Sequence, residues 1–166
     1  FRAMSADDYE SEKVICAAAD FAGSKADKAN RTSFTVGGKD VNNLLHFIDQ
    51  RVGRWDPLEW IDEMFSIQTR WNPEVFWVED GVIWKAVRAM VYREMQTRDI
   101  RINIEAVPSI KDKATRGRSL QRRMRAGQCR FDAAAVLELR AVGDRATLLD
   151  IETFENLSRV GHGLTL

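Results

Sequence analysis

Short apolar runs separated by turn-forming residues predict that the chain begins with strands. The runs lie at residues 14 to 20, 32 to 38 and 42 to 53. The connections between them, GSKADKANR and GGKDVN, carry the Gly, Asn and Asp that favour turns. The pattern therefore predicts three successive antiparallel strands arranged as a meander.

The next stretch, WDPLEWIDEMFSIQTRW, has the signals of a helix start followed by helical periodicity. Asp56 can act as the N-cap, Pro57 fits the first helical position, and Glu59 completes a capping box. Apolar residues then recur at helical spacing, at Leu58, Ile61, Met64 and Phe65. This stretch is predicted to be an amphipathic helix.

Strands and helices alternate in the remainder of the chain. The apolar run that ends at Glu79 predicts a strand, and VIWKAVRAMVYREMQTRD predicts a second helix. A strand at 101 to 107, a basic helix at 111 to 125 and a short strand at 128 to 131 follow, before one or two helices broken around Gly143. In this α/β order the strand at 74 to 79 is expected to pair in parallel beside the first strand.

Two of these predicted strands deliver an acid to their carboxyl end. VICAAAD ends in Asp20, and VFWVED ends in Glu79 and Asp80. If the two strands are parallel neighbours, about 4.8 Å apart, their terminal carboxylates can share one divalent cation or a pair of them. Carboxylate oxygens without His or Cys suit Mg²⁺ and Mn²⁺, and such a site is suited to phosphodiester hydrolysis.

A structural interpretation of these acids is also open. A carboxylate at a strand end is often a solvated boundary residue or a helix N-cap, and Asp80 before Gly81 fits that description. Asp20 is the stronger candidate for chemistry, because an aspartate that follows CAAA in a buried strand needs a compensating partner.

Composition limits the class of protein. A chain of 166 residues with 45% hydrophobic and 30% charged residues is typical of one soluble domain, and no apolar run approaches the roughly 18 residues of a membrane span. Nothing resembles G-x-x-x-x-G-K-[ST], which excludes a P-loop ATPase within this sequence. Cys16 and Cys129 show no metal-ligand spacing and are expected to be reduced.

The net charge is zero, but KDKATRGRSLQRRMR at 111 to 125 holds seven basic residues and one Asp. Such a helix can neutralise DNA phosphates, or it can be an ordinary solvated face. The candidate DNA-binding residues are Lys111, Lys113, Arg116, Arg118, Arg122 and Arg123.

Three stretches in this order resemble one known family. AAADFAGSKADKANRTSFTVGG, WNPEVFWVEDG and PSIKDKATRGRSLQRRMRAGQCRF are similar to the C-terminal nuclease domain of bacteriophage terminase large subunits, over about residues 12 to 132. The resemblance implies an RNase H-like α/β fold, with a mixed sheet of five or slightly more strands in the order 3-2-1-4-5, flanked by helices. It also implies a metal-dependent endonuclease that acts on double-stranded DNA.

The resemblance also implies a set of site residues. Asp20 matches the first catalytic acid and Glu79 the second, around two Mg²⁺ or Mn²⁺ ions. The family's third acid lies in an Asp-pair motif that is absent here, so Asp150 is the preferred substitute and Asp144 the alternative. The two auxiliary acids are Asp27, in the KAD turn, and Asp80, which assists or replaces Glu79.

Domain limits and partners follow from the same resemblance. The expected division is a tail at 1 to 11, whose first four residues could be foreign to the natural protein, a nuclease domain at 12 to 157, and a flexible tail at 158 to 166. The family's motor is absent, so the chain is expected to be a nuclease fragment that is monomeric in isolation. It is expected to work in the host cytoplasm. The partners implied by the family are double-stranded DNA, the portal protein and the terminase small subunit. The alternatives are another RNase H-like nuclease, such as a junction resolvase, and a non-catalytic DNA-binding or assembly module.

Overall fold

The computed structural model describes residues 2–22, 31–108 and 113–135. Within residues 113–117 and at residue 119 the description is limited to the backbone. In chain order the elements are α1 (Ala6–Glu10), β1 (Lys13–Asp20), β2 (Thr32–Asp40), β3 (Leu45–Gly53), α2 (Pro57–Trp71), β4 (Val75–Glu79), α3 (Val82–Arg98), β5 (Ile104–Val107), α4 (Lys113–Arg125) and β6 (Cys129–Phe131).

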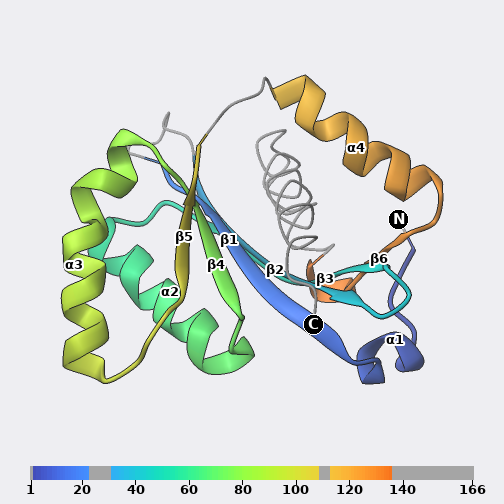
Figure 1. The fold of residues 1–166 in the computed structure, drawn as a ribbon, viewed down its shortest axis with the longest axis horizontal. Coiled ribbons are helices and arrows are strands. Elements are labelled where there is room, and N and C mark those ends of the chain that lie inside the picture. The colour runs from blue at the N-terminus through green and yellow to red at the C-terminus, as the bar shows by residue number, and fades with distance from the viewer. Residues whose placement is uncertain (1, 23–30, 109–112, 136–166) are drawn as a thin grey trace.

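The strands form one mixed sheet in the order β5-β4-β1-β2-β3-β6. β1, β2 and β3 pair antiparallel as a meander, whereas β4 pairs in parallel with β1 and β5 in parallel with β4. The predicted order 3-2-1-4-5 is therefore confirmed, and β6 extends the sheet in parallel beside β3. Figure 1 shows the sheet between α2 and α3 on one side and α4 on the other.

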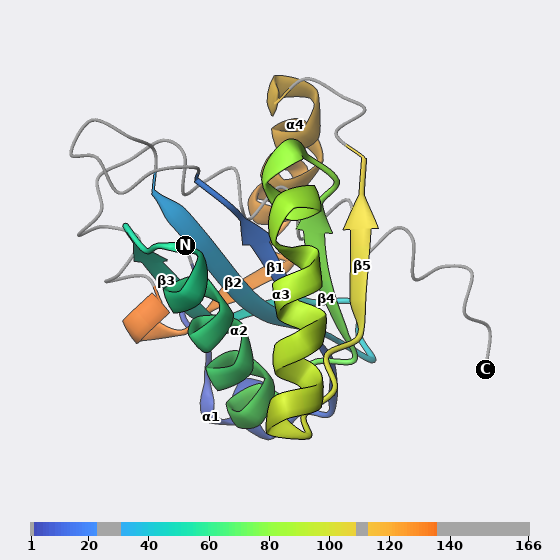
Figure 2. The same cartoon turned by 90° about the vertical axis from the view of Figure 1, so that its left-hand side faces the viewer.

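Helices α2 and α3 cover one face of the sheet, as Figures 1 and 2 show. The core of this layer joins strand residues such as Phe34 and Phe76, both fully buried, to Ile61 and Met64 of α2 and Val91 of α3. Burial of each such side chain contributes about 1.5 to 3 kcal/mol.

The predicted start of α2 is confirmed. The Asp56 side chain accepts hydrogen bonds from the backbone N–H groups of Leu58 and Glu59, both at 3.0 Å. The Glu59 carboxylate accepts in return from the Asp56 N–H at 2.8 Å, which closes the capping box.

Helix α4 lies over the opposite face of the sheet (Figure 1). Leu120 of α4 is buried against Leu45 and Phe47 of β3 and against Cys129 and Phe131 of β6. This second, smaller core covers the β3–β6 side of that face. The other side of the face, formed by β1 and β4, carries a separate small cluster built on Ala18 and Trp77.

Two predicted strands begin three residues later than expected. The strand predicted from residue 42 begins at Leu45, because the preceding residues form a turn in which Asp40 Oδ1 accepts from the N–H groups of Asn42 and Leu44, both at 2.9 Å. The strand predicted from residue 101 begins at Ile104, and Ile102 is buried ahead of it.

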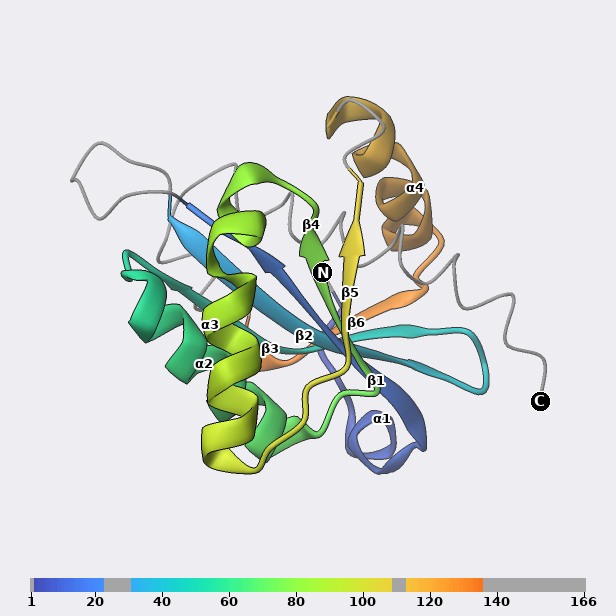
Figure 3. The same cartoon turned by 60° about the vertical axis from the view of Figure 1, so that its left-hand side comes forward.

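The N-terminal residues add to the edge of the sheet. Ala3 forms a parallel bridge with Phe131 of β6, where the Met4 N–H donates to the Phe131 carbonyl at 2.9 Å and the Phe131 N–H donates to the Arg2 carbonyl at 3.0 Å. Figure 1 shows this end of the chain, α1 and β6 on the same side of the molecule as the β2–β3 hairpin, and Figure 3 shows the hairpin extending away from α2 and α3.

Several predictions fall outside the described residues. These are the helices around Gly143, the tail at 158 to 166, and the candidate acids Asp27, Asp144 and Asp150. None of the helices in the described part of the chain combines the length and hydrophobicity that a bilayer span needs.

Candidate functional site

The carboxyl ends of β1 and β4 bring two acids together at one edge of the sheet. The parallel register runs from Cys16 opposite Val75 to Ala19 opposite Val78. Asp20 and Glu79 are the next residue of each strand. Neighbouring strands are about 4.8 Å apart, and residues at the same level of a parallel pair point to the same face. The two acids predicted from the sequence are therefore neighbours.

These acids lie on the sheet face opposite α2 and α3. Side chains alternate along a strand, so Asp20 shares a face with Ala18, and Glu79 shares it with Trp77. Ala18 and Trp77 pack together in the small cluster on that face, whereas Ala19 and Val78 belong to the core beneath α2 and α3. Asp20 is half-buried and Glu79 is exposed, so the pair lies at an open edge.

Asp80 is directed elsewhere. Its carboxylate lies 3.4 Å from Nζ of Lys85 in the first turns of α3, and its N–H donates to the Val107 carbonyl at 2.9 Å. Alternation also sends it to the opposite side of the strand end from Glu79. The geometry favours Glu79 over Asp80 as the partner of Asp20.

Within the described residues, the candidate donors at this edge are carboxylate oxygens. Cys16 lies on the same face as Asp20, but burial raises the pKa of its thiol to about 12, so the thiol is protonated at neutral pH. Two neighbouring carboxylates therefore fit a hard cation such as Mg²⁺ or Mn²⁺. Among the residues that the structure describes, no group of three or more His, Cys, Asp or Glu side chains is arranged to hold a metal ion.

Sequence reasoning missed a third acid on the same face. Glu105 of β5 is the register partner of Trp77, and its carboxylate accepts a hydrogen bond from the Trp77 indole at 3.1 Å. It lies one level behind Glu79, whose register partner is Val107. The signal in the sequence was the alternation along β5, which places Glu105 on the opposite face of the sheet from Ile104.

Three buried polar residues on β2 and β3 were also missed. Ser33, Thr35 and Gln50 are linked by hydrogen bonds on the face that carries Asp20. The signal in the sequence was the presence of polar residues inside TSFTV and FIDQRV, two runs that otherwise predict buried strands.

The candidate DNA-binding residues of α4 differ in their surroundings. Arg118 and Arg122 are exposed, whereas Arg123 is half-buried and donates to the Asn43 carbonyl in the β2–β3 turn at 3.1 Å. Lys111 lies outside the described residues, and the side chains of Lys113 and Arg116 are not described. Arg118 and Arg122 remain the clearest candidates for phosphate contacts.

A cavity of about 680 Å³ lies away from this edge. The described residues that line it come from α1, β1, β3, the C-terminal end of α2 and the segment after β6, and include Tyr9, Asp49 and Trp71 but neither Asp20 nor Glu79. Glu79 is exposed, so this acid is presented at the surface of the molecule.

No protein-family model and no curated protein matches the chain. Solved structures do match. The large terminase nuclease of a thermophilic phage, with bound zinc, is 15% identical over 85% of this chain and 79% of its own, with a TM-score of 0.55. A yeast mitochondrial Holliday junction resolvase is 12% identical over 82% and 74%, also with a TM-score of 0.55.

A third match is the human cytomegalovirus terminase nuclease domain, soaked in manganese with an inhibitor bound. It is 12% identical over 81% of this chain and 70% of its own, with a TM-score of 0.53. At identities this low, the structural matches establish a shared fold and nothing further. The chain therefore has an RNase H-like fold similar to that of terminase nuclease domains and Holliday junction resolvases.

Proposed function

We propose that this protein is a metal-dependent endonuclease that cleaves double-stranded DNA during viral genome packaging, as the nuclease domain of a terminase large subunit does. One observation carries the proposal: Asp20 and Glu79 end two adjacent parallel strands, one residue beyond the register pair Ala19–Val78, in a fold shared with terminase nucleases.

Asp20 and Glu79 would hold the cations, with Asp150 in preference to Asp144 completing the set and Asp27 assisting. When bound, two Mg²⁺ or Mn²⁺ ions would lower the pKa of a water molecule and stabilise the charge that develops on the phosphate. The role of the chain is to fix its carboxylates at one edge and to bring the phosphodiester there. Arg118 and Arg122 on α4 would neutralise neighbouring phosphates.

The exposure of the site fits a polymeric substrate. Glu79 is exposed at the end of β4, and Asp20 beside it is half-buried. A small substrate is usually enclosed, whereas a duplex backbone needs an open edge with basic groups beside it. In the family this nuclease works with a portal protein and a small subunit, which are proposed partners here.

The test is cleavage of supercoiled plasmid in Mn²⁺ or Mg²⁺, with and without EDTA. We expect Asp20→Asn and Glu79→Gln to reduce the cleavage rate at least 100-fold, because each removes a charged ligand at nearly constant volume. The matched control is Asp80→Asn, whose carboxylate faces Lys85 and whose loss should change the rate less than threefold. Cleavage that survives EDTA, or full activity of Asp20→Asn, would contradict the proposal.

A junction resolvase is the second candidate, since a resolvase structure matches with the same TM-score as the phage terminase nuclease. The two functions differ in substrate. A terminase nuclease should cut linear duplex and a four-way junction of the same sequence at similar rates, whereas a resolvase should prefer the junction at least tenfold. If neither is cut and DNA still binds, the chain is a non-catalytic binding module.

A further inference from the structure

Three buried polar side chains form a hydrogen-bonded row across β2 and β3. Ser33, Thr35 and Gln50 are 4%, 1% and 6% exposed. The Thr35 hydroxyl donates to Gln50 Oε1 at 2.7 Å, and Gln50 Nε2 donates to Ser33 Oγ at 3.2 Å. Burial of such groups is unfavourable without hydrogen bonds, and apolar side chains would fill the same space at no such cost.

The row ends opposite Asp20 in the sheet. In the β1–β2 pairing Asp20 lies opposite Ser33, and Ala18 lies opposite Thr35. Directly opposed residues of an antiparallel pair have Cβ atoms about 4.5 to 5.5 Å apart on the same face. The side chain of Ser33 is thus the nearest member of the row to the Asp20 carboxylate, and Thr35 lies one level behind it.

The hydrogen bonds of the row have one direction. Thr35 donates to Gln50, and Gln50 donates to Ser33. A hydroxyl that accepts a hydrogen bond still carries its own proton to donate. A donor at this end of the row matches the acceptor-only carboxylate of the residue opposite, and the chain of donors strengthens each successive bond.

We propose that Ser33, Gln50 and Thr35 are positioning residues, which hold the Asp20 carboxylate in one orientation through the Ser33 hydroxyl. The proposal rests on the proposed function for the role of Asp20 as a metal ligand. A carboxylate that is already oriented binds a cation without ordering its side chain first, and residues in this supporting position typically change metal affinity 10- to 100-fold.

The first test is calorimetric titration of Mn²⁺ into each variant. We expect Ser33→Ala and Gln50→Leu to weaken binding about 10- to 100-fold, and Ser33→Thr, which keeps the hydroxyl, to restore it to within about threefold. The matched control is Gln68→Leu, since Gln68 is similarly buried, at 9% exposed, but lies on α2 and donates to Asn72 Oδ1. An unchanged affinity in Ser33→Ala, or an equal loss in Gln68→Leu, would overturn the proposal.

The second test needs no metal. In the parent protein, Asp20→Asn should shift the side-chain amide resonances of Gln50 in a proton–nitrogen NMR spectrum, whereas those of Gln68 should not move. In a Ser33→Ala background, Asp20→Asn should leave the Gln50 amide unshifted. If Asp20→Asn leaves the Gln50 amide resonances of the parent unshifted, the row does not position Asp20 and the proposal is refuted. If Asp20→Asn shifts the Gln50 amide but the protein binds no Mn²⁺, the row still positions Asp20, and only the proposed function is refuted.

Discussion

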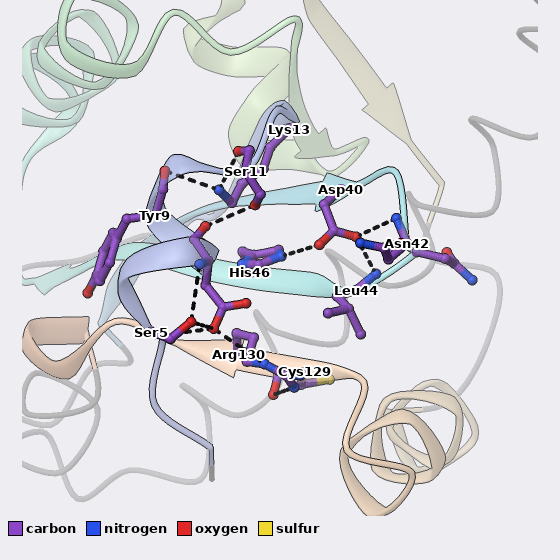
Figure 4. A network of polar contacts seen from close by, with 12 residues as sticks. Ser5, Tyr9, Ser11, Lys13, Asp40, Asn42, Leu44, His46, Cys129 and Arg130 are labelled. Carbon is purple, nitrogen blue, oxygen red and sulfur yellow. Dashed lines mark hydrogen bonds and ion pairs between the residues drawn. The ribbon is translucent and has the colours of Figure 1, made fainter.

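Asp40 and His46 form a buried pair at the end of the β2–β3 hairpin that is remote from the acids. His46 is fully buried, and its Nε2 lies 3.0 Å from Asp40 Oδ2, while Asp40 Oδ1 accepts from the backbone of Asn42 and Leu44 (Figure 4). Burial alone would raise the pKa of Asp40, but these hydrogen bonds and the nearby imidazole outweigh it, so the pKa lies below its usual value.

Because of this pair, the free energy of unfolding depends on pH in the acidic range. A carboxyl whose pKa is lower in the folded than in the unfolded chain stabilises the fold above its ordinary pKa, and that stability is lost as the pH falls through the lower folded-state pKa. We therefore expect the parent to lose stability below about pH 4 and Asp40→Asn to show a smaller loss there.

At neutral pH, Asp40→Asn should reduce the free energy of unfolding by about 1 to 3 kcal/mol, measured by urea titration at several pH values. Asp7→Asn, at an exposed position on α1, is the control and should change it by less than about 0.5 kcal/mol. If the two variants have the same stability at neutral pH, the Asp40–His46 pair does not stabilise the hairpin.

At the scale of elements, α4 combines packing with charge. Leu120 fixes the helix on the sheet through the core around Leu45 and Phe131, and Arg123 ties it to the β2–β3 turn. Arg118 and Arg122 remain exposed. The basic helix is therefore a structural element as well as a candidate DNA-binding surface, which the charge pattern alone could not distinguish.

Single alanine substitutions should separate these roles. Arg122→Ala should weaken DNA binding and lower the slope of log K against log salt by about one unit, because one phosphate contact is lost. Arg123→Ala should mainly lower thermal stability, since its guanidinium bonds the Asn43 carbonyl. Fluorescence anisotropy at several salt concentrations, with thermal unfolding of each variant, measures both effects. Equal salt slopes in Arg122→Ala and the parent would make α4 a solvated face.

Local patterns in the sequence predicted the elements from β1 to β6 but not α1, which lies in the stretch expected to be a tail, and the pairing of β1 with β4 followed from the order of the elements. The capping box at Asp56 and the strand ends at Asp20 and Glu79 are local signals, which is why they could be located. The polar residues of the row stand out within strand patterns, but the face on which Gln50 lies could not be predicted, because it depends on a bulge in β3. Val36 pairs with Asp49 and Gly37 with Phe47, so Ile48 is the extra residue, and it places Gln50 on the face of Phe47. Strict alternation would put Gln50 on the opposite face.

At the scale of the whole molecule, the two faces of the sheet have different roles. One face is buried beneath α2 and α3 and provides the main core. The other carries Asp20, the polar row and the α4 contact, so the candidate chemistry stays clear of the main core. Substitutions at the acids can therefore be made with little effect on the main core.

The pairing of residues 2 to 4 with β6 has a consequence for association between molecules. An unpaired strand edge offers N–H and C=O groups to any other extended chain, and proteins usually cover such edges. Here the Met4 N–H and the Arg2 carbonyl pair with Phe131. These residues therefore cap the sheet.

Removal of residues 1 to 4 should therefore leave a folded monomer that self-associates as its concentration rises, because a second copy can pair with the uncovered edge. Met4→Pro, which removes one donor to Phe131, should do so more weakly, and Met4→Ala, which keeps the N–H, should stay monomeric in sedimentation velocity. A shortened chain that remains monomeric at every concentration would mean that β6 needs no cover. If the shortened chain does self-associate, residues 1 to 4 prevent edge-to-edge polymerisation. A tag placed at this end of the chain would then affect solubility before it affected cleavage.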